Sequence, residues 1–432
     1  MRLGNGVPVV VRSRPGADVT TVSLWILLGS RHETAPGITH LLEHVLMQAA
    51  PAGHRMRVVD ELEHLGGEAN ALTARDHLAL YARVPAPDAL PALRVLADAL
   101  GNTDFPAELV AAERRVVDEE LRLAAADPND TVHDAFFATA FAGQQLGAPV
   151  GGTAASVATL TPTDLTGWTR ANVRAGTVAA VVSGDIEPDE VVAALDGGPV
   201  GALPPGPEPG PGPGTAPAED PPRPTSGRTD LQLNSDTAAV IVGGHGFALA
   251  DPRLPAAEVL VELLVGGNAS VLHEEIRSNR GLTYDMWGTA TGYRDIGVWR
   301  IGMSTAPENR DTVVDLAIEL IMNAVAAGFD REQVAVARRR VAALRRLDAE
   351  SSLDEVLWLG QHRLIGRDHG WTLRRYADAL HRVEPADVAE CAELMLQRLV
   401  VATAGGPANG VALSDREERI WNATLSAVAD PR

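Results

Sequence analysis

The sequence predicts an α+β fold of two homologous, sandwich-like halves, each an antiparallel-rich sheet covered by helices. Two observations carry this prediction: a helical segment occurs twice, at residues 105–123 and 329–347, and a proline- and glycine-rich stretch separates the copies. Around these segments β-rich stretches alternate with amphipathic helical patterns, which is typical of α+β domains. A chain of 432 residues can hold two domains with sizeable cores.

The repeat is read directly from the sequence. The segment FPAELVAAERRVVDEELRL from Phe105 aligns without gaps with FDREQVAVARRRVAALRRL from Phe329. Identical pairs include Val110 with Val334, Arg114 with Arg338 and Val117 with Val341. A match over this length indicates two copies of one structural unit.

The domain boundaries follow from composition. Residues 197–228 read GGPVGALPPGPEPGPGPGTAPAEDPPRPTSGR and show no apolar periodicity. Proline at this density favours an extended, semi-stiff tether over packed structure. We therefore predict a first domain at 1–196, a linker at 197–228 and a second domain at 229–432.

The first half contains the pattern His40-Leu41-Leu42-Glu43-His44. On a helix both imidazoles of this H-x-x-E-H order share a face with the carboxylate beside them, which suits zinc ligands and a proton acceptor. The strand-like run 19–28 precedes it, Pro36-Gly37 predicts a turn, and Thr39 is a plausible N-cap. Five-residue patterns also arise by chance and on solvated helices, so support is needed elsewhere.

Candidate carboxylates lie on the predicted helix 109–126. Glu113 and Glu120 are two turns apart on one face, whereas Glu119 lies about 100° round the helix. All three could be solvated. In the second copy, however, Ala337 and Leu344 stand at the positions of Glu113 and Glu120, and the paired histidines are missing as well. Loss of both features together is what one shared site predicts.

Composition sets further limits. The formal net charge of −20 argues against nucleic-acid binding. The sequence has no apolar run of 18 residues and no leader-like start, so we expect a cytoplasmic protein without membrane contact. The single Cys391 excludes an internal disulfide and a cysteine metal cluster, and its helical surroundings indicate core packing.

Over nearly all of its length the chain resembles the pitrilysin/insulinase family of zinc peptidases, the inverzincins, and within it the bacterial branch that resembles mitochondrial processing peptidase. The motifs that carry the resemblance are GSRHETAPGITHLLEH, GGEANALTARDH (66–77), DPNDTVHDAFFATAF (127–141) and EEIRSNRGLTYDMWGTATGYRDIG (274–297). The resemblance implies a zinc endopeptidase whose two halves or two chains close like a clam shell around unstructured peptides or a peptide precursor.

The resemblance also assigns residues. The family's third zinc ligand follows the second histidine by 76 residues, which is the position of Glu120, so that His40, His44 and Glu120 would bind Zn²⁺. Glu43 would take the proton of the metal-bound water, and Glu113, seven residues before Glu120, would orient a ligand.

Further roles come from the other motifs. The strand around Ala69, Asn70, Ala71 and Thr73 would receive the peptide as an added strand. Arg280 and Tyr284 would donate hydrogen bonds to the substrate backbone or to the developing oxyanion. Since this element faces the metal of a partner chain in the branch, we expect a homodimer, or a heterodimer with a related chain.

The sequence departs from the family at several positions. It has Leu41 where phenylalanine is common, VLMQAAPAG after the metal helix, and NASVL at 268–272 where Ser-Ser-Arg-Leu is common. These positions shape packing and the substrate groove, so substrate preference stays open. Two alternatives also stay open: a subunit active only in an obligate heterodimer, and a non-catalytic scaffold.

Overall fold

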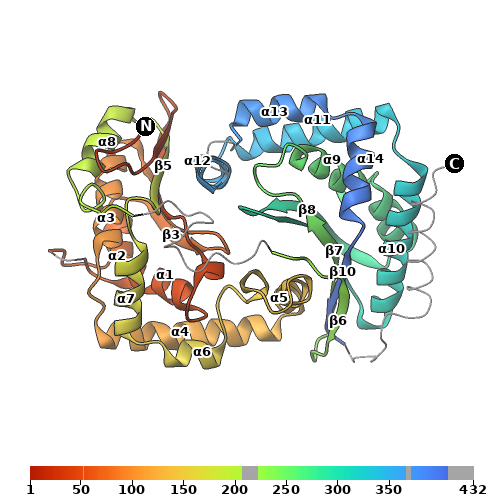
Figure 1. The fold of residues 1–432 in the computed structure, drawn as a ribbon, viewed down its shortest axis with the longest axis horizontal. Coiled ribbons are helices and arrows are strands. Elements are labelled where there is room, and N and C mark those ends of the chain that lie inside the picture. Colours follow the sequence, from red (N-terminus) through yellow and green to blue (C-terminus); the bar gives the residue numbers. More distant parts are fainter. Residues whose placement is uncertain (52, 207–221, 366–370, 407–432) are drawn as a thin grey trace. The chain divides into compact units, whose positions relative to one another are not determined.

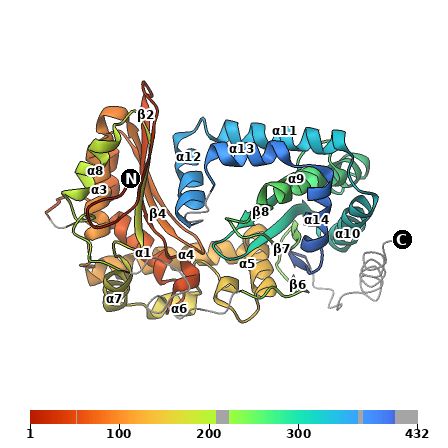
Figure 2. The ribbon, with the colours of Figure 1, turned by 45° about the horizontal axis from the view of Figure 1, so that its top comes forward.

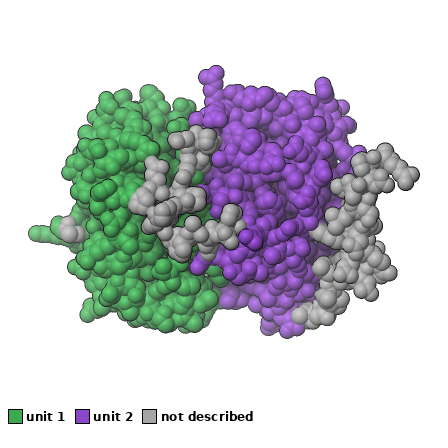
Figure 3. Space-filling model, in the orientation of Figure 1, with its two compact units in different colours: residues 1–122, 148–220, 347–370 green, residues 123–147, 221–346, 371–432 purple. Residues whose placement is uncertain are grey.

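The computed structural model describes residues 1–51, 53–206, 222–365 and 371–406. The chain forms two compact units, and neither is one continuous stretch (Figure 3). Unit 1 is made of 1–122, 148–220 and 347–370; unit 2 is made of 123–147, 221–346 and 371–432. The domain boundaries predicted at 196 and 229 follow the composition of the chain. The compact units divide the chain differently, because each unit includes a segment from the other half.

Unit 1 is built on a five-stranded sheet (Figure 1). In spatial order its strands are β1 (Val9–Ser13), β5 (Val178–Gly184), β2 (Val19–Ile26), β4 (Leu78–Pro85) and β3 (Glu68–Thr73). The β1–β5 pair is parallel and the other pairs are antiparallel. Along β2, Val22, Leu24 and Ile26 join the main core, while Trp25 on the opposite face is also fully buried. The sheet is therefore covered on both faces at its centre.

Helices cover this sheet, and α3 and α8 lie side by side on it (Figures 1 and 2). The helices of unit 1 are α1 (Ile38–Gln48), α2 (Val58–His64), α3 (Ala89–Gly101), most of α4 (Ala107–Ala126), α6 (Ala154–Thr159), α7 (Pro162–Asn172), α8 (Pro188–Asp196), α12 (Ser352–Leu359) and the π-helical η6 (Gly360–Ile365). Two short 3₁₀ turns, η1 (Ser30–His32) and η2 (Ala86–Asp88), complete it.

Unit 2 repeats the design with its own five strands. In spatial order they are β6 (Gly227–Leu231), β10 (Leu399–Ala404), β7 (Ala238–Gly246), β9 (Gly297–Thr305) and β8 (Thr283–Gly292). Its helical elements are α5 (Pro128–Ala140), η3 (Gln145–Gly147), α9 (Leu254–Val265), η4 (His273–Asn279), η5 (Pro307–Asn309), α10 (Arg310–Ala327), most of α11 (Arg331–Asp348), α13 (Leu373–Arg382) and α14 (Pro385–Met395).

The two sheets have equivalent topology, which confirms the predicted α+β fold of two homologous halves. In both, the parallel pair lies at one edge and three antiparallel pairings follow. The repeated helices also make equivalent contacts. Arg114 on α4 donates to the carbonyl of Leu160 (3.1 Å), just after α6, and Arg338 on α11 donates to that of Val383 (2.9 Å), just after α13. The identical arginines are thus explained by structure rather than by chemistry at a site.

The discontinuity of the units has a simple origin. The helix that follows α4, α5, packs on β6, β7 and β10 of unit 2, where its phenylalanines form an apolar cluster with the sheet. The helix that follows α11, α12, packs on β2 and β5 of unit 1. There the buried Glu355 accepts a hydrogen bond from Ser183 Oγ (2.6 Å) and pairs with Arg12 (3.3 Å). Each sheet is therefore completed by a helix that follows the long helix of the other half.

The predicted linker at 197–228 needs correction at both ends. Val200 is buried in the core of unit 1 and Leu203 packs against that core. At the other end β6 begins at Gly227. Residues 207–221, which hold its most proline- and glycine-rich part, lie outside the described residues. The described ends of the predicted linker therefore belong to the two folded units. The prediction missed them because single apolar side chains and a short edge strand produce no apolar periodicity in the sequence.

Two smaller expectations can be compared with the structure. Cys391 is buried, as predicted, and burial raises the pKa of its thiol to about 12. Among the helices of the described residues, none combines the length and the apolarity needed to cross a bilayer.

Candidate metal centre

The H-x-x-E-H motif lies on α1, as predicted. Leu41, Leu42, Val45 and Leu46 on one face of α1 are buried in the core of unit 1. The helix begins at Ile38 after Gly37, whose φ of 85° is accessible to glycine at little cost. Thr39, the predicted N-cap, lies inside the first turn instead. That prediction failed because a glycine cap has no side chain by which to recognise it.

Glu33 provides the cap that Gly37 lacks. One carboxylate oxygen of Glu33 accepts the N–H of Gly37 (2.7 Å) and the other that of Thr39 (2.8 Å), which satisfies two free donors at the start of α1. The side chain is buried, and burial raises its pKa to about 7 although the bonds from Thr39 and Gly37 act in the opposite direction. This carboxylate fixes the first turn of the helix that carries His40.

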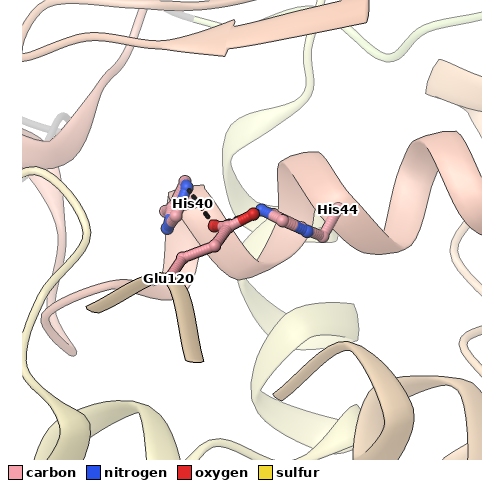
Figure 4. Close-up of side chains that lie close together, drawn as sticks. All are labelled: His40, His44 and Glu120. Atoms are coloured by element: carbon pink, nitrogen blue, oxygen red, sulfur yellow. Dashed lines mark ion pairs between the residues drawn. The ribbon is translucent and has the colours of Figure 1, made fainter. Parts of the chain in front are cut away.

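His40, His44 and Glu120 converge (Figure 4). Glu120 Oε2 on α4 lies 3.3 Å from His44 Nε2 and 3.9 Å from His40 Nε2. One ligand atom from each residue lies within 4.8 Å of the other two, which is close enough for a single ion to contact all three. Figure 4 shows the Glu120 carboxylate reaching between the two rings of α1.

The donor set fits zinc. Two imidazole nitrogens and one carboxylate oxygen form a common ligand set of catalytic zinc sites, which keep a fourth position for water or substrate. Burial, and secondly the charge of neighbouring His44, lowers the pKa of His40 to about 4. The His40 ring is therefore neutral at pH 7, as a metal ligand must be.

Glu113 lies behind His44. Its Oε2 is 3.5 Å from His44 Nδ1, the ring nitrogen that does not face Glu120. Glu119, by contrast, pairs with Arg122 (2.7 Å) on an exposed part of α4. Helical spacing predicted that Glu113 and Glu120 share a face and that Glu119 faces elsewhere. The structure places Glu113 and Glu120 on either side of the His44 imidazole.

Glu43 is held by a residue of the neighbouring sheet. Its Oε2 accepts a hydrogen bond from Thr73 Oγ1 at the end of β3. Burial raises the pKa of Glu43, while the bond from Thr73 and the charge of His44 oppose the shift. A carboxyl group beside the convergent ligands, with a pKa above its ordinary value, suits proton transfer.

The predicted substrate strand, which includes Ala69, Asn70 and Ala71, is β3. Within the described part of the chain β3 pairs only with β4, so it forms an edge of the sheet. Arg280 and Tyr284 lie elsewhere, in unit 2. Arg280 pairs with Glu275 (2.8 Å), and the Tyr284 side chain is 85% exposed at an irregularity of β8. Their roles toward substrate stay predictions.

Comparisons with known proteins identify the family of the chain. The family model described as insulinase (peptidase family M16) matches residues 8–154, which contain all the convergent residues, and the model described as the peptidase M16 inactive domain matches residues 159–341. The chain belongs to peptidase family M16. The M16 match in two successive parts agrees with the two homologous halves.

Curated relatives of the chain are named as zinc proteases. An uncharacterized zinc protease of Mycobacterium tuberculosis is 28% identical over 94% of this chain and 92% of its own length. One of Streptomyces coelicolor is 29% identical over 77% of this chain and 73% of its own.

Solved structures share the fold at low sequence identity. A peptidase M16 inactive domain from Pseudomonas fluorescens matches with a TM-score of 0.84 at 20% identity, covering 94% of this chain and 97% of that chain. A protease from Helicobacter pylori matches with a TM-score of 0.83 at 19% identity, covering 94% and 98%.

The sequence did not reveal two neighbours of the M16 site. Glu33 was missed because it caps α1 from the other side of the turn that precedes the helix. The sequence signal that could have revealed it is an acidic residue four positions before a glycine at which a helix starts. Gly151 was missed because it contributes only space: a Cβ there would lie 3.4 Å from His40 Nδ1 and 3.0 Å from a methyl carbon of Leu121. Close approach of backbone to a ring leaves no trace in one sequence.

Replacing Glu33 with glutamine is expected to change how stability depends on pH. The pKa of Glu33 is raised from 4.5 to about 7 on folding. The protonated side chain therefore contributes to the free energy of unfolding in full below pH 4.5, and this contribution is lost as the pH rises through 7. The size of that shift corresponds to about 3 kcal/mol. Urea unfolding of the metal-free wild type and Glu33→Gln from pH 5 to 8 should show their free-energy difference falling as the pH rises. A difference that is constant over this range would contradict the assignment.

Proposed function

We propose that the chain is a zinc-dependent endopeptidase that hydrolyses unstructured peptides or processes a peptide precursor. The observation that carries this proposal is the convergence of His40, His44 and Glu120 beside Glu43, whose carboxylate is bonded to the end of the edge strand β3. A metal site alone could be structural. The carboxyl group of Glu43 on the same helix and the open strand edge add a base and a place for an extended peptide.

The residues divide the chemistry between them. His40, His44 and Glu120 would hold the zinc ion, which when bound would supply Lewis-acid chemistry toward the scissile carbonyl and water. Glu43 accepts the proton of the attacking water and later passes it to the leaving amine. Glu113, opposite Nδ1 of His44, favours the tautomer that leaves Nε2 for the metal.

The substrate class follows from β3. An added strand needs backbone N–H and C=O groups that are not already paired, so a segment inside a folded sheet or helix cannot bind in this way. Asn70 and Leu72 have exposed side chains on the strand and would contact alternate residues of a bound peptide. Arg280 and Tyr284 are proposed to contact the substrate backbone.

Replacing Glu113 with glutamine is expected to weaken zinc binding by about 10- to 100-fold, because the neutral amide lacks the negative charge that Glu113 places 3.5 Å from Nδ1 of His44. Competition titration with a chromogenic chelator measures this. Glu119→Gln is the matched control on the same helix, since Glu119 is exposed and pairs with exposed Arg122, and it should bind zinc as tightly as wild type. Equal affinities for the two variants would contradict the orienting role.

The proposed function is tested on the purified full chain with zinc analysis, gel filtration and a library of unstructured peptides. One zinc per chain, with cleavage that a chelator abolishes and added zinc restores, supports it. Zinc without cleavage by the homogeneous chain would overturn the proposal for the isolated protein and favour a subunit that needs a related partner. Absence of zinc would favour a non-catalytic scaffold.

A further inference from the structure

The Thr73 side chain is directed at Glu43. Its hydroxyl donates to Glu43 Oε2, across from β3 to α1. Strand side chains alternate between faces, so Thr73 shares a face with Ala71, which is 7% exposed and belongs to the core. Leu72 between them is 38% exposed on the opposite face. The hydroxyl is therefore directed at the carboxyl group of α1.

Hydrogen bonds and an ion pair fix the end of β3, which carries the donor Thr73. Just beyond Thr73, the N–H of Ala74 donates to the carbonyl of His77 (2.8 Å), which closes the turn into β4. The carbonyl of Ala74 in turn accepts the N–H of Ser30 (3.0 Å) in the loop that leads to α1. A buried ion pair between Arg31 and Asp76 (3.3 Å) holds the same loop to the same turn. The strand end and the segment before the metal helix are thus tied together.

Glu43 needs such a support. A glutamate has three rotatable side-chain bonds, and a general base must present its oxygen within hydrogen-bond reach of the water. A bond to Oε2 fixes the orientation of the carboxylate and leaves Oε1 as the oxygen that receives the proton.

We propose that Thr73 is a positioning residue for the general base: its hydroxyl orients Glu43, and the strand that receives the peptide thereby also sets the base. This rests on the proposed function and differs from the sequence prediction, in which Thr73 binds substrate. The position of the base relative to the peptide then depends on β3 as well as on α1, which carries Glu43.

Two substitutions separate orientation from substrate contact. Thr73→Val keeps the shape and the backbone N–H and replaces the hydroxyl with a methyl group, which cannot donate a hydrogen bond. It should lower kcat by about 10- to 100-fold and change KM by less than about twofold, since misplacement of a catalytic group costs rate rather than binding. Thr73→Ser restores the hydroxyl and should recover most of kcat. Both variants should keep the zinc content of wild type.

Several results would overturn the proposal. A raised KM with unchanged kcat for Thr73→Val would make Thr73 a substrate contact. A Thr73→Ser variant as slow as Thr73→Val would show that the hydroxyl is not what matters. Wild-type kcat for Thr73→Val would exclude any role.

A readout without catalysis tests the contact itself. Denaturation midpoints of metal-free wild type, Thr73→Val, Glu43→Ala and the double variant form a double-mutant cycle. The two single shifts should not add, because each removes the same hydrogen bond. Additive shifts would show that the side chains do not interact and would overturn the proposal. If wild type cleaves no peptide, the proposed function fails, while this cycle still decides whether Thr73 holds Glu43.

Discussion

Replacing Glu43 with glutamine is expected to lower kcat for peptide hydrolysis by about 10²- to 10⁴-fold and to leave the zinc content unchanged. Glutamine matches the shape of glutamate but cannot accept a proton from water. Its amide oxygen can still accept the bond from Thr73, so the surroundings of the site are preserved. Initial rates on one fluorogenic peptide, with zinc analysis of the same samples, measure both effects.

The control for Glu43→Gln is Glu63→Gln, an exposed glutamate on α2, which should have wild-type rate and zinc content. If Glu43→Gln hydrolyses peptide at the wild-type rate, Glu43 is not the base. If it loses zinc together with activity, the loss belongs to the metal site and the proton-transfer role has no support.

Replacing His44 with alanine is expected to abolish both activity and stabilisation by zinc. His44 contacts Glu120 through one ring nitrogen and Glu113 through the other, so its removal takes away a ligand and the group that links the two carboxylates. A ligand that binds only the folded protein at 100 times its Kd stabilises by about 2.7 kcal/mol. Thermal unfolding of metal-free protein should therefore shift upward with added zinc for wild type and not for His44→Ala.

His64→Ala provides the comparison. His64 is exposed at the end of α2, where its Nδ1 lies 2.7 Å from the carbonyl oxygen of Asp60, and it takes no part in the convergent group. Zinc should stabilise this variant as much as wild type. An equal zinc-induced shift in His44→Ala would show that the ion binds elsewhere on the chain.

Much of the fold could be predicted because its signals are repeated or local. The gapless match between the segments at Phe105 and Phe329 predicts two like units, and the equivalent contacts of Arg114 and Arg338 explain part of that match. The exchange of α5 and α12 could not be predicted. An amphipathic helix shows which of its faces is buried, but not which of two similar sheets it covers.

The site divides in the same way. His40, Glu43 and His44 could be predicted from the sequence because helical spacing alone puts them together. Glu113 and Glu120 could be predicted because the second copy of the repeat lacks both. Contacts that depend on tertiary structure could not be predicted from the sequence. Thr73 reads as one of several small polar residues on a strand, and Glu33 as one of many acidic residues, until folding places each against α1.

X-ray absorption at the zinc edge of the purified wild-type chain identifies the atoms that bind the metal. We expect about one zinc per chain, bound by two imidazole nitrogens and carboxylate or water oxygen at distances near 2.0–2.2 Å, and loss of this zinc signal in His44→Ala. A chain that binds no zinc, or zinc whose imidazole signal is unchanged in His44→Ala, would contradict the proposed zinc site.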